Sequence, residues 1–397
     1  APSWVGVIGG ATAPAVSGEA PEPAGSQLAR SSATARILTL DVGSDGTTSG
    51  SIHPVKLTAQ QGSGNGEVKL SVGGGTPRLR KNAGSAVQRM AKAHGNWPKG
   101  VTATAKLGSW YRSHEADSAA VACAVLVDAV MRGRFLDDNV VLIGGIDSQG
   151  KVRRVREIRP RLLGVSDAEG KIIGVPLNDE GEVGDMGILQ DFDALMNNQI
   201  IGLDTVDDAV ALAGIERTEN LDKALKLFAE IQEIAKSKDT EQLVRNAKVR
   251  ERLVEIVRLA PNHLSARHLH NAGSNKPRGK LSFQGSRDAL TAAAVPLGKA
   301  AGYDVPGTVL VKTPADVAQD CVFALQDLRP RLHNATLDYC DALSRYAAAF
   351  KEYSKTTNPV SARARTMKKN MDNALRELAA AAARFRKIDK ARYSAGA

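Results

Sequence analysis

The residues of this sequence best suited to chemistry are Glu115-Ala116-Asp117-Ser118, which directly precede a run of small and apolar residues extending to Val130. A serine at the start of a helix acts as a nucleophile when a general base removes its proton. The backbone N–H groups of the first helical turn would then hold the oxyanion. The same position suits a helix N-cap, where the hydroxyl bonds to a backbone N–H and stabilises the helix by about 1 kcal/mol. The segment therefore predicts either a nucleophile or a cap at Ser118.

No other motif in the sequence predicts a cofactor or a metal site. The phosphate-binding pattern Gly-x-x-x-x-Gly-Lys-[Ser/Thr] does not occur, which argues against an ATPase. The seven histidines lack the spacing of metal ligands, and no serine lies in a Gly-x-Ser-x-Gly turn between a strand and a helix. We therefore expect neither a cofactor nor a metal.

Strands and helices alternate around these residues, which is typical of an α/β domain. We predict this domain for residues 36–216, after a flexible arm at 1–35 that is rich in Gly, Ala, Pro and Ser. The predicted strands are 37–42, 51–59, 66–72, 140–145 and 171–176, and the predicted helices are 83–94, 118–131 and 157–168.

Strand patterns end after Arg217, so the rest of the chain is predicted to be all-α. Residues 217–305 read as helices, one repeat-like turn near Pro261 and a Gly/Ser/Lys loop at 272–286. Residues 306–397 predict a long antiparallel hairpin of two helices, the first of them kinked at Pro330. If Pro330 begins a new antiparallel helix instead, Cys321 and Cys340 are able to meet.

Residues of about 36–216 resemble the proteolytic domain of Lon proteases, the serine-lysine peptidases. The resemblance implies the Lon proteolytic fold, Ser118 as the nucleophile, Glu115 as the acid before it, and assembly into a homo-oligomeric ring. It rests on five segments in the family's order: 115–120, 140–152, 155–163, 171–178 and 200–210.

The family's general base is not retained. In Lon proteases a desolvated lysine takes the proton from the serine. Its position is occupied here by Arg159, whose guanidinium stays protonated and so cannot act as a base. We expect Arg159 to pair with Asp117 or Glu115 and to close the site. The family's supporting threonine, two glycines and early-strand acid fall at Ile143, Arg156, Glu157 and Thr58.

One lysine is a candidate substitute for the missing base. Lys56 lies two residues before Thr58, so both side chains point to the same face of a strand. From there Lys56 would reach Ser118 from another direction, provided that it is buried.

Two functions follow from these residues. The first is a catalytically degenerate Lon-type peptidase, without an ATPase module, that binds or scaffolds an unfolded polypeptide or a protein partner. The alternative is an active, ATP-independent serine endopeptidase that uses Ser118 with Lys56 as its base.

The charge distribution adds a third, weaker function. The chain has a formal net charge of +10, and residues 361–392 hold ten Lys and Arg against three acids. Such a surface suits nucleic acid, although a solvated helix face has the same composition.

Apolar runs, cysteines and the first residues bear on where the protein is located. No apolar run approaches the roughly 20 residues that span a bilayer, so we expect no membrane span. The three cysteines are too few for a disulfide framework. The start Ala1-Pro2-Ser3 is typical of a mature end left by signal peptidase and favours export, although an artificial start explains it equally well.

Overall fold

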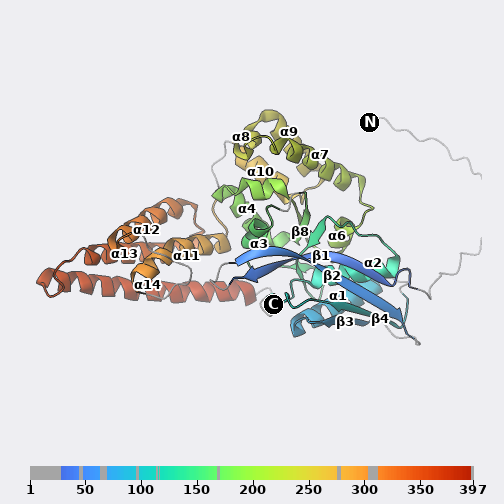
Figure 1. Cartoon of the computed structure of the whole chain (residues 1–397), viewed down its shortest axis with the longest axis horizontal. Coiled ribbons are helices and arrows are strands. Elements are labelled where there is room, and N and C mark those ends of the chain that lie inside the picture. The colour runs from blue at the N-terminus through green and yellow to red at the C-terminus, as the bar shows by residue number, and fades with distance from the viewer. Residues whose placement is uncertain are drawn as a thin grey trace, which may run out of the picture.

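The computed structural model describes residues 28–43, 48–62, 69–94, 98–112, 115, 117–167, 170–274, 279–302 and 312–394. Figure 1 shows an α/β part and a helical bundle that projects from one side of it. Most of the predicted arm, residues 1–27, lies outside the described residues. Its last residues are not an arm, because the first strand begins at Ser32.

A seven-stranded sheet forms the centre of the α/β part, in the order β3-β4-β2-β1-β5-β8-β9. β2 is antiparallel to both of its neighbours, and all other neighbouring strands are parallel. The strands are β1 (Ser32–Val42), β2 (Thr48–Gln61), β3 (Lys69–Gly73), β4 (Val101–Lys106), β5 (Val140–Leu142), β8 (Ile172–Pro176) and β9 (Gln199–Leu203). The short strands β6 (Gly145–Ile146) and β7 (Val152–Arg153) pair separately after β5.

One face of the sheet is covered by α1 (Pro77–His94), α2 (Ala120–Arg132) and α6 (Val206–Ala213). Every residue from Ala120 to Met131 is buried, so α2 is surrounded by protein. A helix that is apolar on all sides needs such a position. Its small side chains allow close packing against Val55 and Leu57 of β2.

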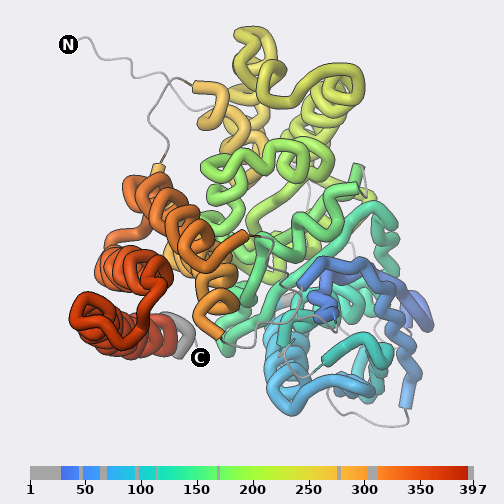
Figure 2. The backbone as a smooth tube through the Cα atoms, turned by 60° about the vertical axis from the view of Figure 1, so that its left-hand side comes forward, coloured from blue at the N-terminus to red at the C-terminus, as the bar shows by residue number. Residues whose placement is uncertain are grey.

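The other face is covered by a thicker helical layer. Its buried side chains form one cluster with Val141, Ile173 and Ile200 of the sheet. Figure 2 shows α7 to α10 stacked on α4 and α5, and all of these helices contribute residues to the same buried cluster. The helices are α3 (Ile158–Gly164), α4 (Glu180–Leu189), α5 (Phe192–Asn197), α7 (Glu219–Ala235), α8 (Thr240–Arg245), α9 (Ala247–Leu259) and α10 (Leu264–Gly273).

The C-terminal bundle consists of α11 (Phe283–Ala300), α12 (Pro314–Leu328), α13 (Leu337–Ser354) and α14 (Ala362–Ser394). The prediction of one helix kinked at Pro330 is wrong. Two 3₁₀ turns follow Leu328, and a separate helix, α13, begins at Leu337. Pro330 lacks the N–H and the space that a continuous helix requires. α12 and α13 therefore pack side by side, which brings the free thiols of Cys321 and Cys340 into one core cluster.

Asp185 of α4 links the bundle to the α/β part. Its carboxylate accepts hydrogen bonds from the Ser282 N–H at 2.6 Å and the Ser282 hydroxyl at 2.5 Å. Ser282 is also the N-cap of α11, because its Oγ accepts a bond from the Gly285 N–H. Thus α7 to α10 share their core with the sheet, while α11 to α14 have a core of their own.

Across the described ranges, no helix combines the length and the apolar character needed to cross a membrane.

Candidate functional site

The candidate site lies where β1 and β5 diverge. These two strands pair only at Arg36–Val141 and Ile37–Leu142, after which β5 ends and β1 continues. After β1 the chain passes to β2, on one side of this point. After β5 it passes on to β8, on the other side. We call the space between the two diverging strands the crevice. The buried side chains of Glu115 and Arg161 fill it, and Leu40 of β1 bonds to Glu115 there.

Ser118 lies in this crevice with 3% of its surface exposed. Its hydroxyl donates a 2.7 Å hydrogen bond to Glu115 Oε2, and Tyr111 Oη lies 3.4 Å from Ser118 Oγ. α2 begins two residues later at Ala120, and its N-cap, Ala119, makes no side-chain cap bond. The cap prediction for Ser118 is therefore wrong, because its hydroxyl is bonded to Glu115.

A buried ion pair lies beside Ser118, and Arg161 provides it instead of the predicted Arg159. Arg161 Nη1 donates to Glu115 Oε1 at 3.1 Å and to Oε2 at 2.9 Å. The two side chains are 3% and 0% exposed. The Leu40 N–H donates to Glu115 Oε1 at 2.8 Å. Arg161 Nε completes the set with a 3.1 Å bond to the Arg156 carbonyl.

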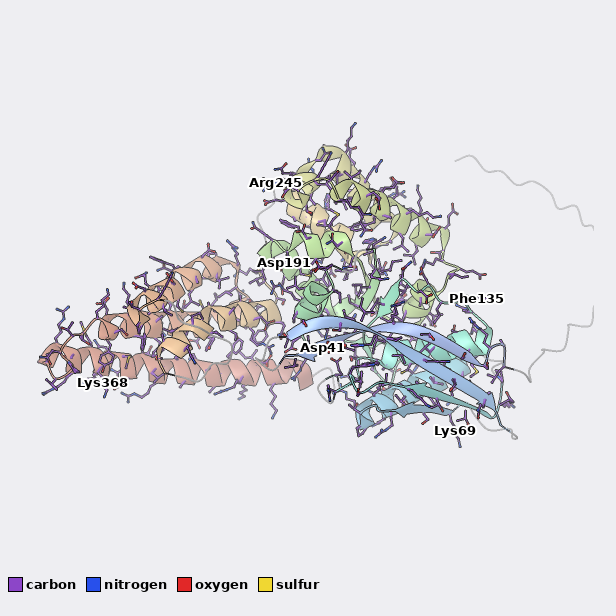
Figure 3. All side chains as sticks on the ribbon, in the orientation of Figure 1. Asp41, Lys69, Phe135, Asp191, Arg245 and Lys368 are labelled. Carbon is purple, nitrogen blue, oxygen red and sulfur yellow. The ribbon has the colours of Figure 1, made fainter. Side chains whose placement is uncertain are left out.

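Arg159 lies elsewhere, and the predicted pair with Asp117 or Glu115 is wrong. Its guanidinium bonds to Asp191 at 2.8 and 2.9 Å, with about a quarter of each side chain exposed. Figure 3 shows Asp191 well away from Asp41, which marks the end of β1. Residues two apart on a helix point roughly 200° apart, so only one of the two arginines can face the crevice.

Asp117 has its own partners beside the crevice. Its carboxylate accepts a 2.7 Å bond from Asn82 and lies 3.4 Å from the Arg78 guanidinium. It is also packed against Gly145, where a Cβ atom would lie 2.8 Å from Asp117 Oδ2. Asp117 therefore fixes α1 and β6 around the site.

Lys56 is not brought to Ser118. Its side chain is exposed, whereas Val55 and Leu57 on either side are buried in the cluster that contains α2. Successive side chains of a strand point to opposite faces, so Lys56 points away from the helix that follows Ser118. Thr58 lies on the same exposed face.

The backbone donors of a potential oxyanion hole are also engaged. The Ser118 N–H bonds to the Glu115 carbonyl at 2.9 Å, and the Ala120 N–H bonds to the Asp117 carbonyl at 2.9 Å. The Ala119 N–H is 3.4 Å from Tyr111 Oη. Burial raises the pKa of the Tyr111 phenol, so it stays neutral beside Ser118.

Two buried acids hold the segment that positions Arg161. Asp179 accepts bonds from Arg154 Nε at 2.7 Å and the Val155 N–H at 3.0 Å. Glu182 accepts a 3.2 Å bond from the Ile158 N–H at the start of α3. Burial raises the pKa of both carboxyl groups. These contacts hold the turn before α3.

The approach of α3 to β2 sets its rotation. A Cβ atom on Gly50 would lie 1.8 Å from the Arg161 carbonyl oxygen, so only glycine allows this contact. The residue pair 50 and 161, rather than any local motif, therefore points Arg161 into the crevice. Sequence reasoning missed Arg161, because the contact that orients it joins two residues far apart in the chain.

No protein-family model matches this chain, and a search of curated proteins found no match. The resemblance to Lon proteases therefore remains a prediction.

Proposed function

We propose that this chain is a Lon-type peptidase-like protein that has lost catalysis and acts as a protein-binding or scaffolding module. The observation that carries this proposal is the Ser118–Glu115–Arg161 cluster. The Ser118 proton is directed at a carboxylate whose two oxygens already accept bonds from Arg161 and from the Leu40 N–H. Transfer of the Ser118 proton to Glu115 would neutralise this carboxylate and leave the buried Arg161 guanidinium without its counter-charge, which is costly.

The surroundings of Ser118 oppose acyl transfer for two further reasons. A peptide carbonyl must approach the nucleophile to about 3 Å, but Ser118 is 3% exposed. Among the described residues, no lysine or histidine side chain hydrogen-bonds to the Ser118 hydroxyl. A serine peptidase needs such a base, because the free hydroxyl is a weak nucleophile.

A binding role is the function that remains for a fold whose crevice is closed. The resemblance suggests flexible polypeptide or a protein partner as the ligand, and a homo-oligomer as the assembly. The projecting bundle offers a second large surface beside the α/β part (Figure 1). The 397 residues carry no P-loop, so any such binding would not be driven by ATP hydrolysis in this chain.

Casein, an unstructured protein, tests the loss of catalysis. The protein and its Ser118→Ala variant are incubated with fluorescein-labelled casein, and cleavage is followed on gels. We expect no cleavage above buffer by either protein, and no labelling of Ser118 by a fluorophosphonate probe. Cleavage that depends on Ser118 would overturn the proposal.

The same labelled casein tests binding. We expect a saturable rise in fluorescence anisotropy, equal for the protein and for Ser118→Ala, because the hydroxyl is buried. No saturable binding would exclude flexible polypeptide as the ligand. Sedimentation velocity of the unmodified protein tests the expected oligomer.

A further inference from the structure

The outer face of α14 carries a regular row of cationic side chains. α14 is a 33-residue helix along the outer edge of the bundle, and it is straight in Figure 1. It packs inward through Ala364, Ala374 and Ala381, which are buried. Arg365 and Lys387 are exposed on the opposite side.

The spacing of this row is fixed by helix geometry. Arg365, Arg376 and Lys387 follow one another at intervals of eleven residues, close to three helical turns. They therefore share one face at separations of about 16.5 Å, and the outer two lie about 33 Å apart. Lys368, Lys369 and Arg386 are exposed beside them, and Figure 3 shows Lys368 at the outer edge of the bundle. We call these six residues the basic face.

The charge of the basic face is not compensated. None of its six residues forms an ion pair within the described part of the chain. Two acids of α14 are already paired, Glu377 with Arg345 at 2.9 Å and Asp389 with Arg287 at 3.6 Å. Asp372 is the remaining acid of this stretch, and it is exposed.

The exposed residues between the cations indicate which class of partner fits the basic face. Every exposed residue from Arg365 to Lys387 is polar, charged or alanine. An interfacial membrane helix requires large apolar side chains, and a single-strand binding site requires aromatic ones on which bases stack. A smooth cationic face suits a rigid array of phosphates instead. On B-form DNA the same strand returns after about 34 Å, which matches the separation of Arg365 and Lys387.

We propose that the basic face of α14 binds the phosphate backbone of double-stranded DNA without sequence preference. Arg365 and Lys387 contact one strand at points one turn apart, and Arg376 contacts the strand between them. This binding does not depend on the Ser118 site or on the proposed loss of catalysis.

Salt dependence of DNA binding tests this proposal. The full chain is titrated into a fluorescein-labelled 24-bp duplex at 50 to 200 mM NaCl, and anisotropy is measured. Six phosphate contacts predict a slope of log K against log [salt] near −5, or roughly a 10³-fold loss of affinity over this range. Replacing Arg365, Arg376 and Lys387 by Gln should lower the slope to about −3.

The matched control removes the same charge elsewhere. It carries Lys223→Gln and Lys226→Gln on α7 and Lys236→Gln at the C-cap of α7, three lysines whose side chains are exposed. This control should bind DNA as the unmodified protein does, and circular dichroism should show equal thermal stability for all three proteins. Absent DNA binding, or equal loss in both triple variants, overturns the proposal. Displacement of the duplex by poly-glutamate or anionic vesicles at equal charge concentration overturns the choice of DNA.

Discussion

Replacing Arg161 by methionine tests the buried ion pair most directly. Methionine keeps the length and packing of the side chain but removes the guanidinium. Glu115 then loses the Arg161 guanidinium in a site where its side chain is fully buried. The Leu40 N–H and the Ser118 hydroxyl, which also bond to this carboxylate, are neutral.

The expected loss of stability is larger for Arg161→Met than for Arg159→Met. Breaking a buried pair by removing one partner costs about 3–5 kcal/mol, because the other charge is left uncompensated. The Arg159–Asp191 pair is about a quarter exposed, so Arg159→Met should cost below about 1 kcal/mol. The double variant Glu115→Gln/Arg161→Met should recover much of the loss, because it leaves no buried charge.

Urea unfolding followed by tryptophan fluorescence is a suitable assay. Trp110 lies edge-to-face with Tyr111, 6.0 Å between ring centroids, and so reports on the α/β part near the site. With a slope of about 2 kcal/mol per M, a 4 kcal/mol loss moves the midpoint by ~2 M. Equal midpoints for Arg161→Met and Arg159→Met would refute the buried pair as the element that closes the crevice.

Three further predictions concern other buried groups. Burial raises the pKa of Asp185 to about 6, so its stabilising contribution is present at low pH and is lost as pH rises through 6. In urea titrations, the free energy of unfolding of Asp185→Asn should therefore rise relative to that of the unmodified protein by up to ~1.4 kcal/mol per pH unit between pH 4 and 6. A difference that does not change with pH would contradict this. Burial lowers the pKa of His263 to about 3, so its contribution is present above pH 6.5 and is lost as pH falls towards 3. The free energy of unfolding by which the unmodified protein exceeds His263→Gln should accordingly become smaller as pH falls below 6.5. An increase of this difference would exclude a neutral buried imidazole. Gly50→Ala should destabilise by several kcal/mol, because its Cβ would overlap the Arg161 carbonyl, whereas Gly84→Ala on α1 meets no atom within 4 Å and should stabilise by ~0.5–1 kcal/mol in the same assay.

Local patterns predicted much of the fold. The strand alternation of β1 and β2 and the apolar run of α2 are visible in the sequence, because each depends on neighbours within a few residues. The proximity of Ser118 and Glu115 is local too, since three residues bring them within one turn. The break at Pro330 was harder to place, because a proline either kinks or ends a helix according to what packs beside it.

Non-local contacts decided the rest of the candidate site. The sequence identified an arginine near the serine, but whether residue 159 or 161 faces it depends on the rotation of α3. The contact between Gly50 and the Arg161 backbone sets that rotation, and these residues are far apart in the chain. Likewise, Lys56 points outward because α2 packs on the face that holds Val55 and Leu57.

By itself, then, the sequence determined most of the strands and helices of the α/β part and the proximity of Ser118 and Glu115. Only the tertiary structure decided that Arg161 neutralises Glu115 and that both are buried with the serine. The physical reason is that side-chain periodicity is a property of each element alone. The partner of a buried charge depends on how two elements approach each other, which is settled by packing between distant residues.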